Sequence, residues 1–67
     1  MDPNACLERF ITALDGNDIE EACIAQEDLT TWLGKGGFEP NWTSFKRNGS
    51  PVTKEWFLSW VSPDAQG

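Results

Sequence analysis

Acidic residues between positions 15 and 28 form the densest group of chemically capable side chains in this 67-residue sequence. The group consists of Asp15, Asp18, Glu20, Glu21, Glu27 and Asp28. Oxygen ligands at alternating positions suit Ca²⁺, but the spacing lacks the distal bidentate glutamate of a twelve-residue calcium loop. On a helix these carboxylates instead spread over an outward face. Such a face keeps the surface solvated, attracts a basic protein, or imitates the phosphates of a nucleic acid.

A second group combines aromatic and basic side chains. Trp42 and Phe45 lie next to Lys46 and Arg47, and rings beside cations are used to bind single-stranded nucleic acid or acidic peptides. Two cations are few, because a nucleic-acid footprint normally contains several more. The net charge is −6, so we expect no direct binding of nucleic acid.

The sequence offers few parts for catalysis or metal binding. It has no His and no Tyr, and its Ser and Thr residues mostly fit cap or turn positions. Cys6 and Cys23 match no metal-ligand spacing. We therefore expect no enzymatic activity, no cofactor and no metal, and we expect the cysteines to be small buried residues without a disulfide.

Charge and aromatic content divide the chain near its middle. Residues 1–33 carry eight acidic side chains and one basic one, whereas residues 34–67 carry three acidic and four basic ones and six of the eight aromatic rings. A chain this short is near the lower limit for a single core, so most of these rings are expected to be buried. Among four Trp residues, however, we expect at least one partly exposed ring.

Capping signals predict a helix over about 3–15 and another over about 18–35. Asp2 and Pro3 are a typical N-cap and first helical residue, and apolar residues at helical spacing follow. Gly16 is expected to take the left-handed position that ends the first helix. Asp18 with Glu21 predicts the N-cap of the second helix, and Gly36-Gly37 predicts the C-terminal end of that helix. The short turn makes the pair an antiparallel αα-hairpin.

The last third of the chain carries conflicting signals. Ser50-Pro51 predicts a Trp-rich third helix over about 51–62, with inward-facing side chains at Val52, Trp56, Phe57, Trp60 and Val61. The alternative is a β-hairpin about Asn48-Gly49 with a strand over 56–61, which Pro51 and the lack of alternation disfavour. Residues 39–50 are either a short helical turn or an irregular loop. Residues 64–67 are expected to be a frayed tail.

These patterns predict an all-α, three-helix fold in a single domain over 1–67. No basic N-terminal region and no apolar run of about 18 residues is present, so we expect a cytoplasmic protein without membrane contact. The expected function is a non-catalytic protein-interaction domain, accessory, adaptor or inhibitory, whose partner is a protein, and a basic one if it contacts the acidic face. The predicted contact residues are Trp42, Phe45, Trp56, Trp60, Glu20, Glu21, Glu27 and Asp28. The alternatives are a nucleic-acid mimic that uses the acidic face and a homodimeric structural module.

Overall fold

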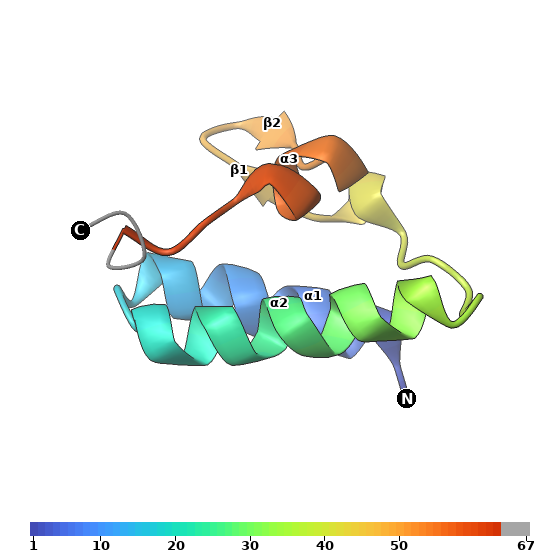
Figure 1. Ribbon diagram of the computed structural model, residues 1–67. Coiled ribbons are helices and arrows are strands. Elements are labelled where there is room, and N and C mark those ends of the chain that lie inside the picture. Colours follow the sequence, from blue (N-terminus) through green and yellow to red (C-terminus); the bar gives the residue numbers. More distant parts are fainter. Residues whose placement is uncertain (64–67) are drawn as a thin grey trace.

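The computed structural model describes residues 1–63 and has two layers (Figure 1). Helices α1 (Pro3–Asp15) and α2 (Ile19–Gly34) form an antiparallel pair, which is the first layer. The second layer lies on one side of this pair. It contains the 3-10 turn η1 (Trp42–Ser44), strands β1 (Lys46–Arg47) and β2 (Ser50–Pro51), and helix α3 (Lys54–Ser59). Among the described residues, no helix combines the length and apolarity needed to cross a membrane.

The N-terminal helix begins where its capping residues predict. Asp2 Oδ1 accepts hydrogen bonds from the backbone N–H groups of Asn4 and Ala5, at 3.0 and 3.4 Å. The predicted end needs a correction, because Gly16 has φ −87° and the left-handed residue is Asn17, with φ 57°. Gly16 N–H still bonds Thr12 O in helical fashion, so the reversal falls one residue later, on a residue type that tolerates positive φ.

Helix α2 also follows its predicted caps. Asp18 Oδ1 accepts a hydrogen bond from Glu21 N–H at 3.2 Å, and Gly36 takes the left-handed conformation with φ 85°. Gly37 lies so close to Trp32 that a Cβ atom there would be 2.3 Å from the indole ring. Trp32 Nε1 donates to Phe38 O at 2.9 Å. The chain therefore turns tightly around this ring when it leaves the first layer.

The structure is mostly helical, but it corrects the predicted boundaries of the last third. The β1–β2 hairpin pairs Lys46 with Pro51 and Arg47 with Ser50. Both turn residues, Asn48 and Gly49, have positive φ, as the favoured two-residue hairpin turn requires. This local signal prevails over Ser50-Pro51, and the predicted helix over 51–62 shortens to α3. The residue that caps α3 is Thr53, whose Oγ1 accepts from Trp56 N–H at 3.0 Å.

Phe10 joins the two layers in the core. Its ring is completely buried and makes edge contacts with Phe57, Trp60 and Trp56 at centroid distances of 4.9, 5.2 and 5.6 Å. Other buried core members are Cys6, Leu7, Ile11, Ala13, Ala22, Ala25, Leu29, Val52 and Phe57. The sequence placed Val61 inward, but Val61 is exposed, because α3 ends at Ser59 and Trp60 is extended.

Gln26 on α2 makes the polar connection between the layers. Its side-chain Nε2 donates to Phe57 O at 2.9 Å and to Trp60 O at 2.7 Å. These carbonyls lie at the C-terminal end of α3, where backbone acceptors lack partners within the helix. One half-buried amide thus terminates α3 and holds it against α2. The predicted tail at 64–67 lies outside the described residues.

Candidate interaction surfaces

The four aromatic residues predicted to contact a partner are all half-buried. Trp42, Phe45, Trp56 and Trp60 pack against the core. Trp42 lies 5.7 Å from Phe57, centroid to centroid, and its Nε1 donates to Glu39 Oε1 at 2.9 Å. These rings stabilise the domain first, and they offer a partner only the parts that remain at the surface.

Glu39 connects two elements of the second layer. Besides the bond from Trp42, its Oε2 accepts from Lys54 Nζ at 3.1 Å. The hydrogen bond from Trp42, and next that from Lys54, lower the pKa of the Glu39 carboxyl group below its ordinary value. The side chain lies at the surface, so the interaction is screened by solvent.

Acid should therefore weaken the folded state partly through Glu39. Its pKa is lower in the folded than in the unfolded chain, so its stabilisation is complete above about pH 4.3 and is lost as the pH falls through the folded value. In urea titrations, we expect wild type to exceed Glu39→Gln in stability at pH 7, and the difference to shrink towards pH 3. Glu8→Gln, at an exposed position of α1, is the control for loss of one carboxylate. An equal difference at both pH values would contradict the prediction.

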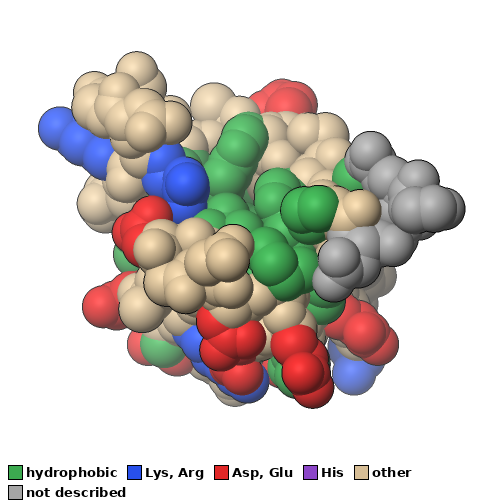
Figure 2. All heavy atoms as spheres, turned by 90° about the vertical axis from the view of Figure 1, so that its left-hand side faces the viewer, with side chains coloured by type: hydrophobic (Ala, Val, Ile, Leu, Met, Phe, Trp, Pro, Cys, Tyr) green, Lys and Arg blue, Asp and Glu red, His purple; other side chains and the backbone are tan. Residues whose placement is uncertain are grey.

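Apolar side chains that sequence reasoning missed are exposed at the end of α3. Leu58 is 46% exposed and Val61 is 53% exposed, on either side of the half-buried Trp60. We call Leu58, Trp60 and Val61 the apolar end of α3. Figure 2 views the molecule from the left-hand side of Figure 1, towards which the chain runs after α3. Hydrophobic side chains gather at the centre of this face, with basic side chains to the upper left and acidic ones along the lower edge.

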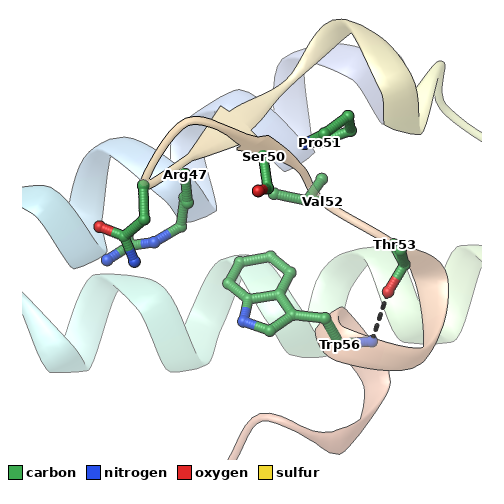
Figure 3. Close-up of a pocket in the computed structure, with 7 residues that line it drawn as sticks. Arg47, Ser50, Pro51, Val52, Thr53 and Trp56 are labelled. Atoms are coloured by element: carbon green, nitrogen blue, oxygen red, sulfur yellow. Dashed lines mark hydrogen bonds between the residues drawn. The ribbon is translucent and has the colours of Figure 1, made fainter.

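A hollow of about 320 Å³ lies between the β-hairpin and α3 (Figure 3). It is lined by Arg47, Asn48, Ser50, Pro51, Val52, Thr53 and Trp56. The Trp56 indole lies below the hairpin, and its nitrogen lies on the same side of the view as the Arg47 side chain. Sequence reasoning missed this hollow because it placed Pro51 and Trp56 on one helix. The Asn48-Gly49 turn was the available signal, since a hairpin there folds residues 50–53 back beside residues 46–47.

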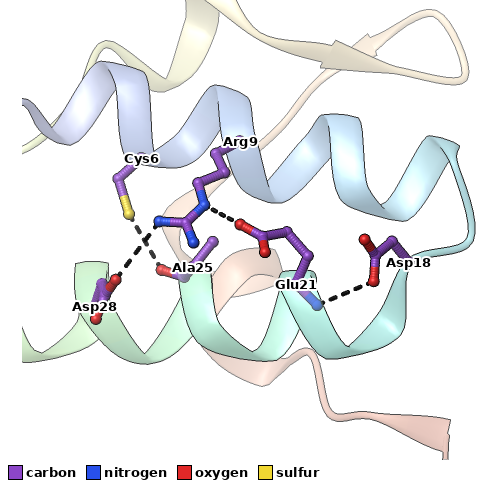
Figure 4. Close-up of polar contacts among 6 residues, drawn as sticks. All are labelled: Cys6, Arg9, Asp18, Glu21, Ala25 and Asp28. Atoms are coloured by element: carbon purple, nitrogen blue, oxygen red, sulfur yellow. Dashed lines mark hydrogen bonds and ion pairs between the residues drawn. The ribbon is translucent and has the colours of Figure 1, made fainter.

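The acidic residues predicted on α2 form two rows with different surroundings. In one row, Glu21 and Asp28 both contact Arg9 of α1 (Figure 4), and the Asp28 contact is 3.8 Å long. In the other row, Glu20 and Glu27 are exposed, and no ion pair joins either of them to another described residue. Ile24, which lies between them in the sequence, is also exposed. Arg9 therefore makes the acidic face less negative.

The two cysteines are free thiols. Cys6 is buried, and its Sγ lies 3.2 Å from Ala25 O as a hydrogen-bond donor (Figure 4). Burial, and next the charge of Asp28, raise the pKa of the Cys6 thiol, which keeps it protonated and unreactive at neutral pH. Cys23 is half-buried rather than buried as predicted. Within residues 1–63, no three His, Cys, Asp or Glu side chains are arranged to hold a metal ion.

Comparisons with protein-family models, with curated proteins and with solved structures found no match for this chain. Three surfaces of the described residues bear on function: the apolar end of α3, the hollow between the β-hairpin and α3, and the acidic face of α2.

Proposed function

We propose that this domain is a non-catalytic protein-interaction domain, an accessory, adaptor or inhibitory module, whose main contact surface is the apolar end of α3. The observation that carries the proposal is the exposure of Leu58 and Val61 around Trp60. One exposed aliphatic side chain is ordinary on a protein surface. Two exposed aliphatic side chains close to a tryptophan in the sequence at the end of one helix resemble the apolar centre of an interface.

The division of charge between the layers would orient the partner. Residues 1–34, which include the helical layer, carry eight acidic side chains and one basic one, whereas residues 35–63 carry two acidic and four basic ones. The helical layer therefore attracts basic regions of a partner and repels acidic ones. Such an asymmetry raises the rate of productive encounters and suppresses wrong orientations more than it adds affinity.

Nucleic-acid mimicry by the acidic face has weaker support. Residues seven apart on a helix, such as Glu20 and Glu27, are separated by about 10.5 Å along its axis. Duplex DNA carries one negative charge per ~1.7 Å. Arg9 further reduces the charge where it contacts Glu21 and Asp28. With Arg9 counted, residues 20–28 carry a net charge of about −3 over roughly 12 Å of helix axis, less than half the charge of duplex DNA over the same length.

Affinity capture from lysate of the source cells, with variants chosen from the structure, tests the proposal. Leu58→Glu should abolish retention of the partner, because it adds a charge to the apolar end of α3. Ile24→Glu is the matched control: it introduces the same charge at another exposed aliphatic position and should keep the partner. Trp42→Ala is less informative, because that ring also packs on Phe57 and bonds Glu39.

Two other outcomes would replace the proposal. In the first, the partner is still captured by Leu58→Glu but is lost at high salt. It is also lost when Glu20, Glu21 and Glu27 are replaced by Gln and Asp28 by Asn. This result would identify mimicry of a nucleic acid. The second is a homodimer in sedimentation velocity that Leu58→Glu dissociates, which would assign the apolar end of α3 to self-association. Circular dichroism of every variant verifies that it is folded.

A further inference from the structure

The hollow beneath the β-hairpin is lined by hydrogen-bond donors and apolar groups, and no carboxylate lines it. We propose that it binds the carboxylate of an acidic peptide segment, an Asp or Glu side chain that follows or precedes an apolar one. The inference rests on the proposed function, and it names the chemistry of a second contact with the partner.

Trp56 supplies the first donor. Trp32 and Trp42 both use their indole N–H groups, in 2.9 Å bonds to Phe38 O and Glu39 Oε1. Trp56 Nε1 has no hydrogen-bond partner within residues 1–63, and it is not sealed in the core. In Figure 3 the indole nitrogen lies on the left-hand edge of the ring, on the same side of the view as the Arg47 side chain. The ring is already held by its edge contact with Phe10, so a ligand does not have to order it.

Arg47 supplies the charge. Its Nη1 contacts Asp15 Oδ1 at 3.0 Å, but guanidinium has five N–H donors and can serve two carboxylates. Asp15 is 67% exposed at its side chain, and ion pairs so exposed contribute little to stability. An incoming carboxylate therefore either shares Arg47 with Asp15 or displaces Asp15 at little cost. Charge-assisted hydrogen bonds of this kind are roughly twice as strong as neutral ones.

The other residues that line the hollow explain why the peptide should carry an apolar residue next to its Asp or Glu. Pro51, Val52 and the face of Trp56 present carbon atoms to the hollow, whereas Ser50 and Thr53 add hydroxyl groups. The volume of about 320 Å³ is at the lower end of ligand pockets, which suits side chains of an extended segment. The acidic helical layer repels the same segment elsewhere, so the hollow becomes its preferred position.

Single-stranded nucleic acid is the competing class of ligand, because a base could stack on Trp56 with a phosphate near Arg47. Such ligands need a track of cations along the backbone. Here the hairpin provides only Lys46 and Arg47, on a chain of net charge −6. The observations therefore favour the peptide.

Nuclear magnetic resonance of the ¹⁵N-labelled protein tests the assignment. The probe is an acetylated, amidated hexapeptide of alternating Glu and Leu. The Trp56 Nε1–H signal, assigned with Trp56→Phe, should shift together with the amides of Ser50, Val52 and Thr53. The same peptide with Gln in place of Glu should bind about tenfold more weakly, the equivalent of one charge-assisted hydrogen bond.

Neighbouring cations on the hairpin give a matched pair of variants. Arg47→Gln should weaken the Glu-Leu peptide about fivefold or more, whereas Lys46→Gln, which removes the same charge outside the hollow, should change affinity less than about twofold. Three results would overturn the assignment: an unmoved Trp56 signal at millimolar peptide, equal losses in both variants, or tighter binding of a thymidine decanucleotide. If the peptide fails but Leu58→Glu still abolishes capture, only the hollow is rejected. If the peptide binds but Leu58→Glu keeps the partner, the apolar end of α3 is rejected.

Discussion

Replacement of Phe10 by alanine should lower the free energy of unfolding by about 3–5 kcal/mol, a large part of the stability of a domain this short. The ring is completely buried and contacts three aromatic rings of the second layer. Removing a buried Phe side chain costs about 3–5 kcal/mol. A domain of this length has a free energy of unfolding of roughly 3–10 kcal/mol, at about 0.05–0.15 kcal/mol per residue. One substitution thus removes a large part of the stability, which far-UV circular dichroism and urea titration would measure.

Phe38→Ala is the control for this prediction. Phe38 is 64% exposed and its ring contacts only Trp32 among the aromatic rings of residues 1–63, so its loss should cost less than about 1 kcal/mol. The two variants lose the same side chain, so the difference between their stabilities measures the effect of burying the Phe ring. A Phe10→Ala protein with a urea midpoint near that of wild type would mean that the two layers do not depend on this ring.

Gln26→Glu should be the second most damaging change, with a loss of about 2–3 kcal/mol at pH 7. The substitution keeps the shape of the side chain but replaces a two-bond donor by a charged acceptor facing Phe57 O and Trp60 O. The end of α3 should then detach from α2. Hydrogen exchange should accelerate at Trp60 N–H, which bonds Trp56 O in the wild type, before global unfolding.

The pH dependence of this variant has a defined sign. Protonation restores a donor to the new carboxyl group, so its pKa in the folded chain must lie above the unfolded value of about 4.3. The relative stability of Gln26→Glu should therefore improve as the pH falls through the folded value. Gln26→Leu loses the same hydrogen bonds without a charge, and its deficit should not depend on pH. Identical pH profiles for the two variants would contradict this account of Gln26.

The helical pair was predictable because its signals are local and agree with one another. Asp2-Pro3, Asp18 and Gly36 each mark a boundary through their own backbone chemistry. In the last third, Asn48-Gly49 and Ser50-Pro51 mark different structures only two residues apart. Their relative strength depends on which one lets Val52 and Phe57 reach the core. That is a tertiary requirement, which the local pattern does not contain.

The candidate surfaces were predictable only where they depend on one element. An outward acidic face on α2 follows from helical spacing, but the contact of Arg9 with Glu21 depends on the register between two helices. The hollow depends on a hairpin that crosses above Trp56. The exposure of Val61 follows from the early end of α3. In each case the missing information was the position of a second element.

The order of the two layers along the chain has a consequence for synthesis on the ribosome. Every residue of α1 and α2 is polymerised before the rings that cover Phe10, the last of which is Trp60. At ~5–20 residues per second, residues 35–60 take about 1–5 s to add. During this interval the nascent helical pair carries its apolar side uncovered. The domain therefore completes folding only when its C-terminal third emerges, and premature termination before α3 would release an aggregation-prone fragment.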